Sequence, residues 1–79
     1  MPTEFRDYRG REVRPVSSRQ AAKLEALARS EPSLILLGQD EDGAIQFSVR
    51  ARFVRGRLHE PRAGRVEPGG RLVWHADVG

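Results

Sequence analysis

The sequence predicts an α+β fold in which one α-helix packs on an antiparallel sheet. Residues 17–31 combine strong helix formers with apolar side chains at helical spacing. Residues 44–54 alternate between apolar and polar side chains, as a strand with one buried face does. The expected order is an N-terminal hairpin, the helix at about 17–31, and an antiparallel three-strand meander at about 33–37, 44–54 and 71–77. A small closed barrel with an inserted helix satisfies the same pattern.

The N-terminal hairpin is expected within the first sixteen residues. "EFRDY" (4–8) forms one strand, Arg9–Gly10 the turn, and "REVRPV" (11–16) the returning strand. Gly10 supplies the positive φ that such a turn requires. Pro15 has no N–H group to donate, so it ends the second strand or lies at a sheet edge.

The helix at 17–31 begins with a capping box. Ser17 is the expected N-cap, and Gln20 follows at the position whose side chain reaches back toward the cap. Pro32 ends the helix. The apolar stripe is narrow and rich in alanine, which predicts close packing on a sheet; it consists of Ala21, Leu24, Leu27 and Ala28.

Two strands and a turn follow the helix. "SLILL" (33–37) is a continuous apolar run with the length of a buried strand. "GQDEDG" (38–43) contains Asp42–Gly43, a strong hairpin signal. Strand 44–54 then directs alternate residues to the core and to water. The expected core face is Ile45, Phe47, Val49, Ala51 and Phe53, and the expected water face is Gln46, Ser48, Arg50 and Arg52.

The alternation changes phase after residue 53, which predicts a bulge or a strand end near Val54–Gly56. Residues 59–70 contain two prolines and three glycines and are expected to form a loop or a weak pair of turns around Val66. Residues 71–77 form the last strand, in which Trp74 anchors the core.

Composition narrows the function classes. The 79 residues are expected to form one small domain, because no linker divides them. The absence of cysteine excludes disulfides, zinc fingers and iron–sulfur ligation, and with an N-terminus that lacks a secretion signal it favours a cytoplasmic location. No apolar run is long enough to span a membrane. A homo-oligomer would enlarge the small core, although no interface can be identified.

Basic side chains are unevenly distributed. Thirteen of the fourteen are arginine, which a GC-rich gene explains, because Arg, Ala, Gly and Pro together make up 34 of the 79 residues. Gene composition does not explain their position: residues 1–49 have a net charge of −1 and residues 50–79 a net charge of +4. The candidate site is the group of arginines in residues 50–65: Arg50, Arg52, Arg55, Arg57, Arg62 and Arg65.

These arginines predict contacts with nucleic-acid phosphates, since guanidinium groups bind phosphate oxygens in pairs. Phe47 and Phe53 are assigned to the core face, so the arginine face lacks rings for base stacking, and backbone contacts are expected instead. The alternative is a protein-binding adaptor or inhibitor, of the type encoded by phages or mobile elements, that uses the same basic surface or an open sheet edge. A solvated basic surface without a partner is the simplest interpretation.

The acidic turn carries Asp40, Glu41 and Asp42. Three adjacent carboxylates lack the alternate spacing and the closing glutamate of a calcium loop. A solvated hairpin tip is therefore expected, with no metal.

Two histidine–carboxylate pairs are the remaining candidates for chemistry: His59 with Glu60, and His75 with Asp77. On a strand only the second pair shares a face. No nucleophile or third ligand is linked to either pair, so the sequence predicts a binding protein that is not an enzyme and holds no cofactor.

Overall fold

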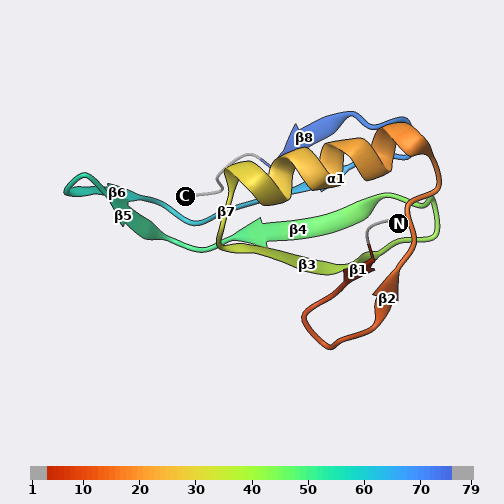
Figure 1. Cartoon of the computed structure of the whole chain (residues 1–79), viewed down its shortest axis with the longest axis horizontal. Coiled ribbons are helices and arrows are strands. Elements are labelled where there is room, and N and C mark those ends of the chain that lie inside the picture. Colours follow the sequence, from red (N-terminus) through yellow and green to blue (C-terminus); the bar gives the residue numbers. More distant parts are fainter. Residues whose placement is uncertain (1–3, 76–79) are drawn as a thin grey trace.

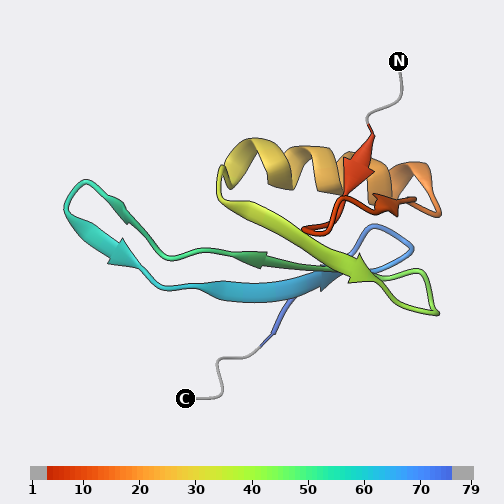
Figure 2. The ribbon, with the colours of Figure 1, turned by 90° about the horizontal axis from the view of Figure 1, so that it is seen from below.

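The computed structural model describes residues 4–75 as one helix and eight short strands (Figure 1). A hairpin of β1 (Phe5–Arg6) and β2 (Glu12–Val13) precedes α1 (Ser18–Ser30). The remaining strands are β3 (Leu34–Gln39), β4 (Ile45–Val49), β5 (Arg52–Val54), β6 (Arg57–His59), β7 (Arg62–Val66) and β8 (Leu72–Trp74). The predicted α+β class is confirmed, with the helix lying along one face of an antiparallel sheet (Figures 1 and 2).

The main sheet has four strands rather than three, in the order β3-β4-β7-β8. The additional strand, β7, lies within the predicted loop 59–70 and pairs with both β4 and β8. Pro61 and Pro68 flank this strand rather than interrupt it. β3 and β8 are the outer strands, so the sheet is open and the closed-barrel alternative is wrong for the described residues.

Gly64 allows β7 to occupy this central place. A Cβ atom there would lie 2.5 Å from the carbonyl oxygen of Val73 and 2.9 Å from the ring of Phe47. The glycine that suggested a loop is therefore required for close packing of neighbouring strands.

β3 begins and ends later than predicted and contains a bulge. Leu36 pairs with Phe47 and Gly38 with Gln46, which leaves Leu37 as an additional residue. Leu36 is buried, whereas Leu37 is 43% exposed, so the expectation of a wholly buried strand is wrong at Leu37.

The helix confirms its predicted cap. The Ser17 Oγ accepts a hydrogen bond from the backbone N–H of Gln20 (3.1 Å). Gln20 is fully buried, and its Oε1 accepts from the N–H of Val16 (2.8 Å). Its Nε2 donates to the carbonyls of Gly43 (2.8 Å) and Val66 (3.0 Å), which ties the helix N-terminus to the β3–β4 turn and to the end of β7.

The core lies between α1 and the sheet. Trp74 is half-buried and packs edge-on against Phe47, with ring centroids 5.2 Å apart. The buried residues that pack together as the core cluster are Val13, Leu24, Leu27, Leu36, Ile45, Phe47, Val49 and Val66. In the described part of the chain, no helix is long and apolar enough to cross a membrane.

The predicted strand 44–54 is two strands. β4 ends at Val49, and after a break at residues 50–51 the chain continues as β5, which within residues 4–75 pairs only with β6. Of the bulge or strand end predicted near Val54–Gly56, the strand end is confirmed, because β5 ends at Val54. Arg55 (φ 52°) and Gly56 (φ 79°) then form a two-residue hairpin turn in which both have positive φ, as in a type I′ turn.

Residues 50–61 therefore form a projecting hairpin, called the arm below (Figures 1 and 2). Ala51 is exposed and Phe53 is 74% exposed, so their assignment to the core face is wrong. The alternation is correct as far as Val49, but α1 ends before it could cover the arm. The last predicted strand is observed as Leu72–Trp74, and residues 76–77 lie outside the described part of the chain.

Candidate functional site

The arm is an extension of the two central strands. β4 leads into it and β7 leads out of it, and within it Arg52 pairs with His59, Phe53 with Leu58, and Val54 with Arg57. Every residue from 55 to 62 is exposed. The main sheet therefore holds the base of the arm while its tip extends into solvent (Figure 2).

Three of the six predicted site arginines are already paired with carboxylates. Arg52 and Arg62 both face Glu31, at 3.5 Å and 3.7 Å. Arg65 faces Glu67 at 3.8 Å. The water face predicted for strand 44–54 is thus wrong for Arg52, whose side chain is 34% exposed and directed to the end of α1.

Glu31 anchors the base of the arm. It caps the C-terminus of α1, where its N–H donates to the carbonyl of Leu27 (2.8 Å), and its side chain is only 17% exposed. The negative end of the helix and the carboxylate both attract the two guanidinium groups. The guanidinium of Arg62 also lies over the Trp74 ring, 3.9 Å from its centroid, so this cluster joins the helix, the arm and the last strand.

The other three arginines extend from the base of the arm to its tip. Arg50 lies in the break after β4, Arg55 in the turn, and Arg57 in β6; all are exposed. None of them forms an ion pair with a carboxylate of residues 4–75. Within the same residues, Arg55 is the only non-glycine residue with positive φ. This backbone conformation is unfavourable for most non-glycine residues, and residues that adopt it are often found at functional sites. The exposed turn at Arg55 is therefore a candidate part of the site.

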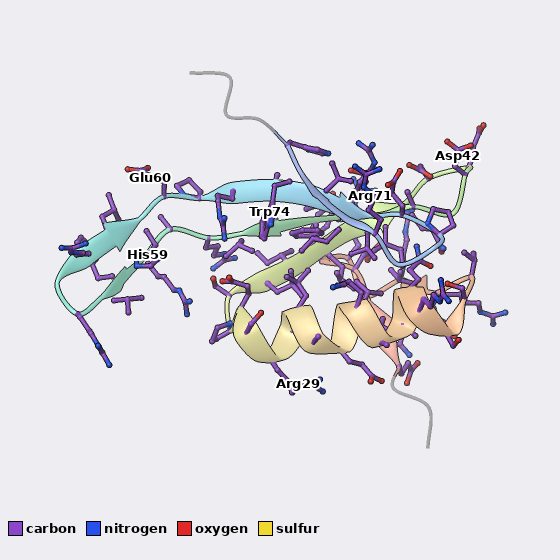
Figure 3. The ribbon with its side chains drawn as sticks, turned by 90° about the horizontal axis from the view of Figure 1, so that it is seen from above. Arg29, Asp42, His59, Glu60, Arg71 and Trp74 are labelled. Carbon is purple, nitrogen blue, oxygen red and sulfur yellow. The ribbon has the colours of Figure 1, made fainter. Side chains whose placement is uncertain are left out.

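A polar cleft of about 310 Å³ lies where the arm meets the helix end. Its lining residues are Glu31, Val49, Arg50, Arg52, His59, Glu60 and Arg62. Figure 3 places His59 and Glu60 on the arm. The polar groups that line the cleft are guanidinium, carboxylate and imidazole groups, which offer ionic contacts.

The acidic turn builds its own hairpin. The Asp40 Oδ1 accepts hydrogen bonds from the N–H groups of Asp42 and Ala44, both at 3.0 Å, and its Oδ2 accepts from Gln46 (3.2 Å). This turn lies at the opposite end of the molecule from the arm (Figure 3).

Neither histidine is part of a metal cluster in the described chain. No three histidine, aspartate or glutamate side chains of residues 4–75 gather closely enough to share a metal ion. His75 is exposed, and its proposed partner Asp77 lies outside the described residues.

One feature of the arm was not predicted from the sequence: a cross-strand pair of apolar side chains that is exposed to water. Phe53 and Leu58 are opposite one another in the register and are 74% and 51% exposed. The segment "FVRGRL" places an Arg-Gly turn at the centre of two short strands, and this signal was sufficient to predict the hairpin. The regular alternation that precedes it favoured a continuous core strand instead.

No protein-family model matches the chain, and neither a curated protein nor a solved structure matches it.

Proposed function

We propose that the protein is a non-enzymatic binding protein that contacts the phosphate backbone of nucleic acid through the arm. The observation that carries this proposal is the presence of three exposed arginines without a carboxylate partner in residues 4–75, spaced along a projecting two-stranded ribbon. Guanidinium groups pair with phosphate oxygens through two parallel hydrogen bonds. A two-stranded ribbon is also narrow enough to enter the major groove of a duplex.

The six predicted arginines contribute unequally in this proposal. Arg50, Arg55 and Arg57 are available without breaking an internal contact. A phosphate that approaches Arg52 or Arg62 competes with Glu31, and one that approaches Arg65 competes with Glu67. The first three therefore provide most of the affinity, and the others add to the positive potential around the base of the arm.

The test is fluorescence anisotropy with labelled duplex DNA, single-stranded DNA and RNA. Three neutralised phosphates give a log–log salt slope of about −2.7 on a duplex, so affinity falls about 100-fold from about 50 to 300 mM salt. In the arm variant, Arg50, Arg55 and Arg57 are each replaced by glutamine, and the slope should approach zero.

A matched control separates the arm from net charge. Arg11, Arg19 and Arg29 are exposed arginines outside the arm, and Arg29 points away from it on α1 (Figure 3). Replacing these three with glutamine removes the same charge and should leave most of the affinity and slope intact. Equal losses in both triple variants would refute a site on the arm, and no binding of any nucleic acid at low salt would refute the proposed function.

A protein-binding adaptor is the second candidate, and the exposed pair Phe53–Leu58 favours it. Apolar side chains surrounded by arginines are typical of the centre of a protein interface. In this case the arm contacts an acidic protein surface, as small phage or mobile-element proteins do. A pull-down that depends on Phe53 but persists after nuclease treatment would support this candidate. Either partner is consistent with the cytoplasmic location that we propose.

A further inference from the structure

We infer that the Phe53–Leu58 face of the arm is a stacking platform for an unpaired base, so that the ligand class is single-stranded nucleic acid. This inference rests on the proposed function and specifies its ligand. It also reverses the expectation from sequence that no aromatic ring is available near the arginines.

The platform is an exposed ring supported by its neighbour. Phe53 is 74% exposed, the largest value among the exposed large hydrophobic residues of the described chain. Leu58 lies opposite it in the register, where cross-strand side chains are close enough to interact. Among the described residues the pair lies outside the core cluster, because the arm projects past the end of α1 (Figure 1).

Charge complementarity favours nucleic acid over a protein as the occupant. Residues 50–62 contain five arginines and a single glutamate. Arg55 lies in the turn, two residues after Phe53, and Arg57, which pairs with Val54, is on the face of the ribbon opposite to Phe53 and Leu58. A strand whose base stacks on the ring therefore passes close to the arginine of the turn, and its phosphates can continue around the narrow ribbon to Arg57.

The size of the exposed apolar surface also favours nucleic acid over a protein as the occupant. A specific protein interface buries about 800 Å² on each partner. Phe53 and Leu58, 74% and 51% exposed, supply well under half of that area, and most of the other exposed residues of the arm are polar or charged. One ring is instead well matched to one base.

An unpaired strand suits this ring better than an intact duplex. In a duplex both faces of every base are covered by neighbouring bases, and a wedge must first unstack a step. An unpaired base presents its face without that cost, and stacking on aromatic side chains tolerates any base. When a single strand and a duplex make the same number of phosphate contacts, the exposed ring therefore favours binding of the single strand.

The experiment compares wild type with Phe53→Ala and Phe53→Leu. The probes are labelled oligothymidylate and oligouridylate of about twelve nucleotides and a duplex of the same length. Loss of one stacked base should weaken single-strand binding by about 5- to 140-fold. Phe53→Leu keeps an apolar side chain and should lose nearly as much, while duplex affinity stays within about two-fold of wild type. Because Phe53 is exposed, unchanged circular dichroism and melting are expected for both variants.

Each outcome of this experiment either supports the stacking platform or overturns it in favour of a named alternative. Selective loss on single strands supports the platform, and the DNA and RNA probes show which sugar is preferred. Wild-type affinity in Phe53→Ala overturns the platform but not the arginine contacts, and equal losses on duplex and single strands indicate a groove wedge and also overturn it. A wild-type dimer in light scattering that becomes monomeric in Phe53→Ala identifies a second copy of the chain as the occupant. Absence of all wild-type binding refutes the proposed function itself.

Discussion

Replacing Gly64 with alanine tests whether β7 occupies the centre of the sheet. The added Cβ would lie 2.5 Å from the carbonyl oxygen of Val73, 2.9 Å from the Phe47 ring and 3.2 Å from the Cα of Trp74. Two of these three neighbours are backbone atoms, which cannot rotate away as a side chain does. The β7–β8 pairing must therefore widen or Phe47 must leave its place.

The expected cost is that of overpacking a small core. Such insertions typically cost about 1–3 kcal/mol, and the rigid backbone neighbours place this one at the upper end. For a domain of this size each kcal/mol lowers Tm by about 4–8 °C, so Gly64→Ala should melt roughly 10–20 °C below wild type. Thermal denaturation followed by circular dichroism measures this difference.

Gly69→Ala provides the matched control. A Cβ at Gly69 has no heavy atom within 4 Å, and the backbone there is not in the positive-φ region. Its Tm should lie within about 3 °C of wild type or above it, because alanine restricts the unfolded chain. If Gly64→Ala and Gly69→Ala have the same Tm, β7 does not pack against β8 in this way, and the base of the arm must be placed differently.

Three further predictions concern the helix and the arm. Gln20→Ala removes the donor to the carbonyls of Gly43 and Val66 and should lower the free energy of unfolding by about 1–3 kcal/mol in a urea titration; a wild-type midpoint would contradict the bridging role of Gln20. Glu31→Gln releases Arg52 and Arg62, so it should reduce stability by about 1 kcal/mol and yet make the salt slope of duplex binding steeper by up to about 1.8; a slope no steeper than wild type would show that these arginines stay unavailable. Arg55→Asn suits the positive φ and should leave Tm unchanged or higher, while nucleic-acid affinity falls; Arg55→Lys, which keeps the charge, should bind more tightly than Arg55→Asn, and equal affinity of the two would contradict an ionic role for this position.

Local signals predicted the elements that depend on neighbours in the chain. The Ser17 cap, the Gln20 position and the stop at Pro32 bracket α1 to within a residue. The Asp42–Gly43 turn and the alternation through Val49 place β4 and its buried face correctly. Each of these features involves residues within about four positions of one another, where hydrogen-bond geometry and strand pleat leave few choices.

The predictions were wrong at residues whose environment is determined by segments distant in the sequence. Gly64 reads as a loop residue until Phe47 and Val73 are placed against it. Phe53 continues a core pattern until the end of α1 leaves it uncovered. Periodicity records which side of a strand a residue faces, but burial also requires a second layer on that side.

Some properties of the candidate site likewise follow from the sequence, and others follow only from tertiary contacts. The number of arginines, their concentration after residue 49 and the resulting positive charge are properties of the chain, and they predict an anionic partner without any structure. Folding then brings Glu31, about twenty residues before the arm, between Arg52 and Arg62, and sets Glu67 beside Arg65. Arg50, Arg55, Arg57 and the Phe53 ring are the groups left facing water. A guanidinium group is available to a ligand only if no carboxylate already satisfies it, and that depends on tertiary contacts, not on composition.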